Sequence, residues 1–321
     1  MDWRSQLTAF LAAQLPSADA VEIVAVRSMP AGASNDTAAL DLKIACDGES
    51  WTVPVVLRPQ REYGILAPYD IQRQFRVMRA LAGSDVPVPV VMWHCADLAV
   101  LGTPFYFMQR VVGETLPLLW YGGRSPRLIA AAAALATVHA VEWRSAGLEF
   151  LLPEQSNATG VSPLGAEMSA WRARAARSPI ASAAWFIALG DYLVQNEPAD
   201  ARLSLLHGDP NPGNYLFQGD RVAAVLDWEL AAIGDPRSDL GFYAALSTTF
   251  GGMSGHRGSS VLSDAYQSVT GVQLTNLEYY EAFGLYRMAA LLASSRGAFS
   301  YYGMDSISRR LSELLGPRWA G

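Results

Sequence analysis

The sequence contains almost no lysine and only two cysteines. Of its 24 basic residues, 23 are arginine, and Lys43 is the only lysine. Any mechanism that requires a lysine therefore has a single candidate. Cys46 and Cys95 are too few for a disulfide framework and too far apart for a metal-knuckle spacing. We expect both to be buried free thiols.

Long hydrophobic runs and a basic surface are also missing. The longest strongly apolar stretch, LIAAAAALATV at 128–138, is far shorter than the roughly 20 residues that a membrane-spanning helix needs. No transmembrane segment and no membrane partner are therefore expected. The first 15 residues, MDWRSQLTAFLAAQL, are typical of an amphipathic helix rather than a secretory signal, which favours a cytoplasmic location. The net charge of -6 gives no reason to expect nucleic acid as a partner.

The first third of the chain has the pattern of a small sheet. Apolar residues make up 51% of the sequence, which indicates a globular protein. Asp47-Gly48 between two β-branched runs is a hairpin signal, and apolar positions recur at helical spacing from Tyr69 to Leu81. The expected strands are 21–28, 37–46, 51–59, 86–95 and 103–112. Residues 1–111 are interpreted as a strand-rich unit with one main helix.

From residue 112 onward the pattern is mainly helical. Ser125 is expected to cap a helix that begins with Pro126 and runs to about Arg144. Thr275 and Glu278 form a capping-box pattern at the start of a long helix. Two more helices are expected within 165–196, and a short strand pair at 215–217 and 222–228. The predicted fold class is therefore α+β, with parts at 1–111 and 112–321.

The octet HGDPNPGN at 207–214 lies between two apolar segments. Its Pro, Gly, Asn and Asp residues are common in turns, so a simple turn is the alternative interpretation. The predicted hairpin that follows would return Asp227 toward Asp209 and Asn214. Phosphoryl transfer needs a carboxylate that accepts the proton of the attacking hydroxyl, and an Asn and a second Asp that hold Mg²⁺. The spacing of these three residues therefore favours a kinase reaction.

Two segments resemble the aminoglycoside phosphotransferase and choline kinase group, within the protein-kinase-like fold. HGDPNPGNYLF is similar to the catalytic loop of that group, and VLDWELAAIGDPRSDLG is similar to its metal-binding segment. A narrower resemblance is to the branch related to the kinase-like domains of acyl-CoA dehydrogenase family members 10 and 11. The stretches that carry it are GASN (32–35), VVLRP (55–59), RALAGSDVPVPVV (79–91), GTPFYFMQRVVGE (102–114) and LATVHAVEW (135–143).

The resemblance implies a two-lobed fold and roles for single residues. The N-lobe would be a small antiparallel sheet with one main helix, ending in a hinge, and the C-lobe would be larger and mostly helical. The implied cofactors are Mg²⁺ and ATP or another nucleoside triphosphate. Asp209 would be the catalytic base, and Asn214 and Asp227 would hold the metal. His207 would brace the catalytic loop, and Asp239 would tie that loop down by hydrogen bonds.

The residues that the resemblance assigns to the nucleotide come from the first part of the chain. Small residues let backbone N–H groups approach phosphate oxygens. The implied phosphate loop is Gly32, Ala33, Ser34 and Asn35, and the implied hinge at 108–111 includes Met108, Gln109 and Val111.

Two positions depart from the usual kinase pattern. A kinase pairs a lysine on its third strand with a glutamate on the first helix. Here Arg58 occupies the strand position and Gln74 the helix position. Arginine can hold phosphate oxygens through two N–H groups, although it is not interchangeable with lysine. Gln74 can hydrogen-bond Arg58 but cannot neutralise it, and Lys43 is expected to be an exposed residue of the preceding strand.

Other polar residues have mainly structural interpretations. His139 is expected to be a packing histidine within a helix, and Asp235 to cap the next helix. The aromatic residues of the long helix after Thr275 are expected to be mostly core. Arg287 and Tyr286 are the candidates for an acceptor pocket.

The leading hypothesis is an ATP- and Mg²⁺-dependent kinase that phosphorylates a hydroxyl of a small molecule. A nucleotide-binding pseudokinase is the alternative that Arg58 and Gln74 suggest, and a metal-dependent hydrolase is a third. The region 145–205 combines several arginines and tryptophans. That mixture suits an apolar or anionic hydroxylated acceptor, such as a hydroxyacyl compound or a macrolide, better than a polyamine. Neither the acceptor nor the oligomeric state follows from the sequence.

Overall fold

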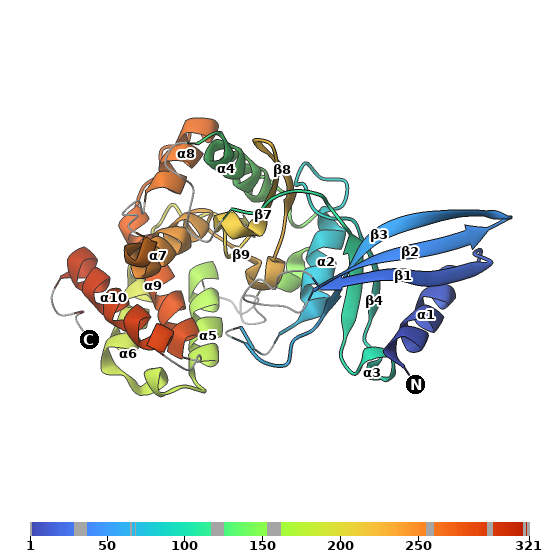
Figure 1. Ribbon diagram of the computed structural model, residues 1–321. Helices are drawn as coiled ribbons and strands as arrows, with labels where there is room; N and C mark the ends of the chain where they lie inside the picture. Colours follow the sequence, from blue (N-terminus) through green and yellow to red (C-terminus); the bar gives the residue numbers. More distant parts are fainter. Residues whose placement is uncertain are drawn as a thin grey trace. The chain divides into compact units, whose positions relative to one another are not determined.

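The computed structural model describes residues 2–28, 37–64, 66–67, 69–116, 125–152, 162–254, 260–293, 298–316 and 319. The chain forms two compact units (Figure 1). The first consists of Met1–Ala82 and Val88–Val112, and the second of Gly83–Pro87 and Gly113–Gly321. The sequence placed the boundary after residue 111 and did not anticipate that the short segment 83–87 belongs to the second unit.

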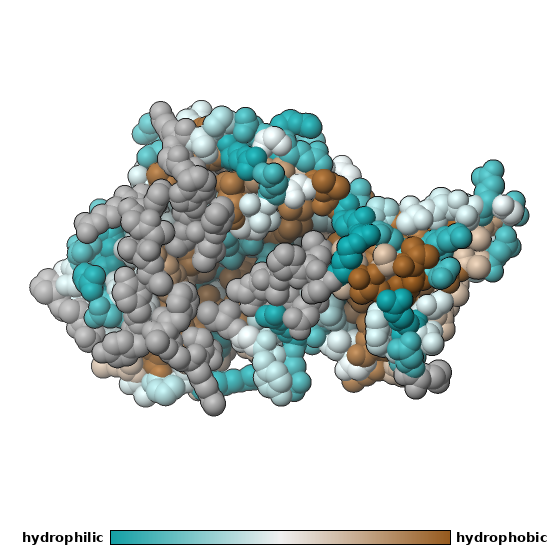
Figure 2. Space-filling view, in the orientation of Figure 1, coloured by the Kyte–Doolittle hydropathy of each residue, from teal (hydrophilic) through white to brown (hydrophobic). Residues whose placement is uncertain are grey.

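The first unit contains a five-stranded antiparallel sheet. The strand order is β1-β2-β3-β5-β4. The strands are β1 (Ala20–Ser28), β2 (Ala38–Cys46), β3 (Glu49–Pro59), β4 (Val91–Cys95) and β5 (Phe105–Gln109). Asp47 and Gly48 form the β2–β3 turn with φ values of 52° and 78°, as a two-residue hairpin loop requires. The end of this hairpin is hydrophilic in Figure 2.

Helices complete the first unit. They are α1 (Trp3–Gln14), α2 (Ile71–Leu81) and α3 (Leu98–Leu101). Leu7 and Leu11 of α1 belong to a hydrophobic cluster that includes Leu42 and Phe105 of the sheet. The side chain of Asp70 caps α2 by accepting a hydrogen bond from the Arg73 backbone N–H at 2.9 Å. The α1 and α2 regions thus match the helices expected from the sequence.

Both cysteines are free thiols. Cys95 is buried, as expected, whereas Cys46 is only half-buried, because it ends β2 beside the exposed hairpin turn. Lys43 is exposed on β2, as expected.

The second unit is mostly helical. Its α-helices are α4 (Pro126–His139), α5 (Pro163–Ala175), α6 (Ala184–Gln195), α7 (Arg237–Ser254), α8 (Val261–Thr270), α9 (Leu277–Ala293) and α10 (Ala298–Leu315). Its strands form two antiparallel pairs, β6 (Ser204–Leu206) with β9 (Ala232–Gly234), and β7 (Tyr215–Gln218) with β8 (Arg221–Val225). Short 3₁₀ turns lie at Glu149–Leu151, Pro179–Ser182, Pro212–Asn214 and Trp228–Leu230. Among the described residues, no helix combines the length and the apolar character needed to cross a bilayer.

Two predicted helix boundaries in this unit are wrong. Ser125 does cap α4, accepting the Leu128 N–H at 3.2 Å, but the helix ends at His139 rather than near Arg144. The long helix does not start from a Thr275 capping box. The Thr275 hydroxyl instead donates to Asp200 at 3.2 Å, and Asn276 has a φ of 58°, so α9 begins at Leu277.

Helices α7 and α9 cross at two glycines. A Cβ atom on Gly241 would lie 2.2 Å from the carbonyl oxygen of Tyr280. A Cβ atom on Gly284 would lie 2.6 Å from the carbonyl oxygen of Gly241. Only glycine permits this approach of the two backbones. The crossing brings Asp239 of α7 and Arg287 of α9 to the same region of the unit.

Candidate active site

The loop between β6 and β7 contains, as its second residue, a glycine that cannot be replaced without moving the backbone. Gly208 has a φ of 87°, and a Cβ atom there would lie 2.0 Å from the carbonyl oxygen of Leu230. The chain therefore turns sharply against the segment after β8. Asp209 follows directly and is half-buried.

Asn214 is hydrogen-bonded to Asp209. The Pro212–Asn214 turn is capped by Asn211, whose Oδ1 accepts the Gly213 N–H at 2.9 Å. Asn214 Nδ2 then donates to the Asp209 carbonyl at 2.8 Å and to Asp209 Oδ2 at 3.1 Å. Both hydrogens of the amide are thus used, which leaves its Oδ1 as the atom able to meet a cation. Asp209 Oδ1 is buried and has no hydrogen-bond partner among the described residues.

The β7–β8 hairpin brings Asp227 back to this loop. The Leu226 N–H donates to the Asn214 carbonyl at 2.8 Å, which fixes the two segments together. Asp227 has φ 64° and ψ 59°, a left-handed conformation that is rare outside glycine. Such a conformation costs on the order of 1–3 kcal/mol and is concentrated at functional sites.

The surroundings of Asp209 shift the pKa of its carboxyl group. Burial raises the pKa of Asp209 above its ordinary value. The side-chain amides of Asn211 and Asn214 oppose this effect, and the nearby Asp227 carboxylate adds to it. A carboxylate with a raised pKa is a stronger proton acceptor once it is ionised, which suits a general base.

Asp239 holds the loop from behind. Its carboxylate is fully buried and accepts the backbone N–H groups of His207 and Gly208, both at 2.8 Å. His139 Nε2 donates to the same carboxylate at 3.0 Å. Burial alone would raise the pKa of Asp239, but the hydrogen bonds from His139 and the backbone outweigh it, so the pKa lies below its ordinary value. The tie that the resemblance implied for Asp239 is therefore present in the structure.

His207 braces the loop through both ring nitrogens. Nε2 donates to the Leu226 carbonyl at 2.7 Å, and Nδ1 accepts the Asp209 N–H at 3.2 Å. The ring lies 4.8 Å from that of Trp228, and the side chain is completely buried. The neutral ring with its proton on Nε2 satisfies both contacts and connects Asp209 to the strand that precedes Asp227.

His139 of α4 supports the Asp209 loop through Asp239, a role that the sequence did not reveal. It is a buried and satisfied histidine, as expected, and its Nδ1 accepts the Tyr266 hydroxyl at 3.0 Å. Its other nitrogen holds Asp239. The only available signal was its place in the LATVHAVEW stretch, and a histidine in an alanine-rich helix does not by itself indicate a partner 100 residues away.

The two candidates for the acceptor pocket are deeply buried. Arg287 is 1% exposed, and its Nη2 donates to the Gly208 carbonyl at 2.9 Å. Its guanidinium also lies 4.4 Å from the centre of the Phe242 ring. Tyr286 is completely buried and stacks on Phe186 at 4.1 Å. Arg287 thus supports the loop that carries Asp209, a contact that the sequence did not predict.

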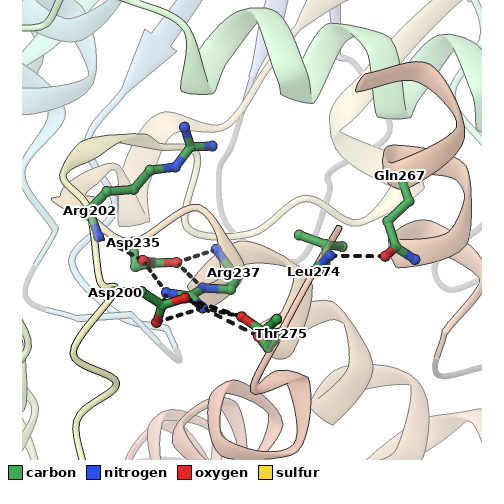
Figure 3. A network of polar contacts seen from close by, with 7 residues as sticks. All are labelled: Asp200, Arg202, Asp235, Arg237, Gln267, Leu274 and Thr275. Atoms are coloured by element: carbon green, nitrogen blue, oxygen red, sulfur yellow. Dashed lines mark hydrogen bonds and ion pairs between the residues drawn. The ribbon is translucent and has the colours of Figure 1, made fainter. Parts of the chain in front are cut away.

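Asp235 has the structural role expected of it. Its Oδ1 accepts the Arg237 backbone N–H at 2.9 Å, at the start of α7. The Arg237 side chain pairs with the same carboxylate at 2.8 Å. Figure 3 shows this pair within a network that also includes Asp200 and Thr275.

The residues assigned to the nucleotide lie in the first unit. Arg58 is half-buried on β3 and pairs with Tyr106 of β5. Gln74 is buried on α2, and its amide nitrogen has no hydrogen-bond partner in the described ranges. The hinge candidates Met108 and Gln109 end β5, and Val111 follows it. The predicted phosphate loop, Gly32, Ala33, Ser34 and Asn35, lies outside the described residues.

The donor atoms near Asp209 suit Mg²⁺ better than a transition metal. Within the part of the chain that the structure describes, no group of three or more His, Cys, Asp and Glu side chains could hold a metal ion. Mg²⁺ needs no such cage, since it usually takes one or two protein oxygens together with water and phosphate. The Asn214 Oδ1 atom and the Asp227 carboxylate supply oxygens of this kind.

Comparison with known proteins identifies the relatives of this chain. The model of the phosphotransferase enzyme family matches residues 26–269. The mouse acyl-CoA dehydrogenase family member 10 is 30% identical over 261 residues, which cover 74% of this chain and 24% of that protein. This chain thus spans only about a quarter of that relative's length.

Solved structures share the fold. A Ralstonia eutropha protein that is described as an aminoglycoside phosphotransferase is 26% identical to this chain. The two structures superpose with a TM-score of 0.66, over 98% of this chain and 97% of that one. The GDP complex of aminoglycoside 2'-phosphotransferase-IIIa is 14% identical, with a TM-score of 0.58 over 97% of this chain and 99% of that one. The fold is therefore the two-lobed protein-kinase-like fold that the sequence predicted.

Proposed function

The chain belongs to the phosphotransferase enzyme family, and on this premise we propose that it transfers the γ-phosphate of ATP to a hydroxyl of a small molecule. The observation that carries the proposal is the arrangement around Asp209. One oxygen of this carboxylate is hydrogen-bonded by Asn214, and the other has no partner among the described residues. The loop itself is held by Asp239 and His207. Such an arrangement leaves one carboxylate oxygen at a fixed place without a partner in the described ranges.

Asp209 would act as the general base. Its Oδ1 accepts the proton of the acceptor hydroxyl while the hydroxyl oxygen forms a bond to the γ-phosphorus. The bond between the γ-phosphorus and the bridging oxygen breaks, and the nucleoside diphosphate leaves with that oxygen. The contact with Asn214 keeps the carboxylate oriented during the transfer. Positioning of this kind supplies much of the rate in phosphoryl transfer.

Asn214 and Asp227 would hold Mg²⁺. When bound, the ion neutralises charge on the phosphate oxygens and orients the γ-phosphate. The left-handed backbone of Asp227 and the Leu226–Asn214 hydrogen bond hold the two ligands on adjacent segments. The strained backbone of Asp227 is the energetic cost of placing this residue on the segment next to Asn214.

We assign the nucleotide to residues of the first unit. Gly32, Ala33, Ser34 and Asn35 would cover the phosphates, and Met108, Gln109 and Val111 would meet the base through the backbone. Arg58 would hold phosphate oxygens, with Gln74 beside it. ATP is proposed as the donor, although the related 2'-phosphotransferase structure contains GDP, so a donor comparison belongs in the first assay.

The acceptor is proposed to be an apolar or anionic hydroxylated compound. The segment between α4 and β6 is rich in arginine and tryptophan, including Trp171 and Arg172 of α5 and Trp185 of α6. The arginines of this segment suit an anionic group better than a polyamine. The name of the mouse relative, an acyl-CoA dehydrogenase family member, adds support for a hydroxyacyl compound.

A screen of hydroxylated acceptors tests the proposal. Release of nucleoside diphosphate is measured with hydroxyacyl thioesters, hydroxy acids, macrolides and aminoglycosides, each with ATP and with GTP. The Asp209→Ala protein is the control for turnover, and the Asp220→Ala protein, changed in the exposed β7–β8 turn, is the control for substitution. Acceptor-dependent release that persists fully in Asp209→Ala would contradict the assignment.

A nucleotide-binding module without transfer activity is the second candidate. It is favoured by Gln74, which is buried where a kinase carries a glutamate and cannot neutralise Arg58. Calorimetric binding of ATP without turnover on any acceptor class would select this function. Turnover that depends on Asp209 would exclude it.

A further inference from the structure

The second unit contains a pocket away from the catalytic loop. It has a volume of about 300 Å³ and is lined by residues that include Leu164, Glu167, Glu197, Arg202, Asp235 and Tyr280. Gly234, at the end of β9, also lines it. Because Ser204 at the start of β6 pairs with Gly234, while Asp209 follows the other end of β6, the pocket and the loop lie at opposite ends of one short strand.

A buried carboxylate faces this pocket. Glu167 of α5 is 7% exposed, and its Oε2 atom has no hydrogen-bond partner within the described residues. A Cβ atom on Gly234 would lie 3.2 Å from this oxygen, so the carboxylate lies against the backbone of β9. The Trp171 side chain hydrogen-bonds the Glu167 carboxylate, so only the Oε2 atom lacks a donor among the described residues. A buried carboxylate oxygen without a donor is unfavourable, and a donor that reaches Oε2 from the pocket would remove that penalty.

The other charged groups of the pocket do not serve Glu167. Asp235 accepts hydrogen bonds from Arg237 and from the Arg202 backbone N–H. Figure 3 shows the Arg202 guanidinium directed away from Asp235. Arg202 is exposed and Glu197 is half-buried, so these two opposite charges offset each other toward the solvent. The acidic character of the pocket is therefore concentrated at Glu167.

Arg287 forms a long ion pair with Glu167, and its Nη1 atom has no hydrogen-bond partner among the described residues. Arg287 Nη1 lies 3.9 Å from Glu167 Oε1, which is too long for a hydrogen bond. The Arg287 guanidinium is held by the Gly208 carbonyl through Nη2 and by the face of Phe242. Burial raises the pKa of Glu167, and Arg287 opposes this only in part. Arg287 thus connects Glu167 to the catalytic loop without satisfying it.

We propose that this pocket binds a small organic ammonium ion, which donates hydrogen bonds to Glu167. An ammonium group carries the donors and the charge that the free carboxylate oxygen requires. A neutral alcohol would supply a donor without charge, and an anion would be repelled. The volume lies at the lower limit of small-molecule sites. Through Arg287 the occupant changes how firmly Gly208 is held, so the pocket influences the catalytic loop from the far end of β6.

Binding is tested without nucleotide, so failure of this proposal leaves the proposed transfer reaction untouched. The probe is n-butylammonium chloride, titrated by calorimetry in the millimolar range, with butan-1-ol and butyrate as neutral and anionic counterparts. Glu167→Gln keeps the shape and removes the charge, and we expect it to weaken n-butylammonium binding about tenfold. Ala201→Phe, at an exposed position that lines the pocket, blocks entry without altering Glu167. Glu278→Gln, exposed on α9, is the matched control and should bind like the wild type.

The connection to the loop is measured by hydrogen exchange of a peptide that spans 203–216. We expect n-butylammonium to change exchange at the His207 and Gly208 amides in the wild type, and to change it much less in Glu167→Gln. Equal binding of butan-1-ol and n-butylammonium would overturn the proposed ligand class. Wild-type affinity in both Glu167→Gln and Ala201→Phe would overturn the site. Binding without altered exchange at the loop would overturn the connection through Arg287.

Discussion

The two residues that support the Asp209 loop, Asp239 and His207, differ from Gln74 on α2 in how fully their buried polar groups are satisfied. Behind the loop, Asp239 accepts three hydrogen bonds, and both ring nitrogens of His207 are used. On α2, the buried Gln74 amide nitrogen finds no partner in the described part of the chain. The support of the loop is thus complete, whereas position 74, where the resemblance implied a kinase glutamate, carries a neutral amide nitrogen that is unpaired among the described residues.

Removing the carboxylate of Asp209 tests the catalytic side of this comparison most directly. Asp209→Asn keeps the shape and removes the proton acceptor, so we expect kcat to fall by about 10²–10⁴-fold. Thermal unfolding should change little, because the supporting contacts of Asp239 and His207 do not involve this side chain. Diphosphate release and the unfolding midpoint are the measurements, with Asp220→Asn as control. An unchanged kcat would show that the completed hydrogen-bond network serves something other than transfer.

Removing the carboxylate of Asp239 tests whether the loop depends on its buried support. Asp239→Ala leaves the His207 and Gly208 N–H groups and His139 without their acceptor, so we expect a loss of about 3–5 kcal/mol in the free energy of unfolding. Urea denaturation measures it. Asp305→Ala is the control, since its ion pair with Arg309 is exposed and should contribute below about 1 kcal/mol. Equal losses in the two variants would refute the role of Asp239.

The pH dependence of stability gives a second view of the same support. Because the folded-state pKa of Asp239 lies below its ordinary value of 3.8, ionised Asp239 stabilises the protein fully above the unfolded-state pKa. That contribution is lost as the pH falls through the lower folded-state pKa. The stability difference between wild type and Asp239→Asn should therefore be largest near neutral pH and shrink below about pH 4. Urea unfolding across pH 3–7 measures it, and a constant difference would contradict the prediction.

The parts of the site that the sequence predicted are those set by local spacing. Asp209, Asn214 and Asp227 lie on one loop and the hairpin that follows it, so their order along the chain indicated that these segments would lie together. Arg287 contacts Gly208 across 79 residues, and this contact depends on the close α7–α9 crossing. A glycine in each helix indicates neither the partner helix nor the register. Long-range partners of this kind require the packed structure.

Thr275 shows the same limit for a local signal. Its spacing to Glu278 satisfied the capping-box pattern, yet its hydroxyl donates a hydrogen bond to Asp200, and Asn276 has a left-handed backbone, so the helix begins only at Leu277. A tertiary hydrogen bond replaced the local one, because the Asp200–Arg237 ion pair lies beside the helix start. Local patterns predict an element here, but tertiary contacts decide where it begins.

A carboxylate at position 74 of α2 tests the second half of the comparison, the neutral side chain of Gln74. The Gln74 side chain is buried, and its amide nitrogen lacks a partner among the described residues. In Gln74→Glu a carboxylate takes this place, and we expect it to orient Arg58 for phosphate. The KM for ATP should fall about fivefold, equivalent to about 1 kcal/mol, with little change in kcat. Steady-state kinetics and ATP calorimetry measure it, with Gln74→Met as a neutral control. A rise in the KM would mean that Gln74 is itself the preferred partner.

Substitution of Lys43 should have the smallest effect on ATP binding of the changes considered. It tests whether this lysine, rather than Arg58, holds the phosphate oxygens of ATP. Its side chain is exposed on β2, where its backbone pairs with Glu22 and Thr52 of the neighbouring strands. An exposed lysine in this position should have no part in phosphate binding, so Lys43→Ala should leave the KM for ATP unchanged and alter stability by less than about 0.5 kcal/mol. ATP calorimetry beside Arg58→Ala makes the test. If Lys43→Ala weakened ATP binding as much as Arg58→Ala, the only lysine of the chain would carry the phosphate contact. The neutral side chain of Gln74 would then no longer bear on nucleotide binding.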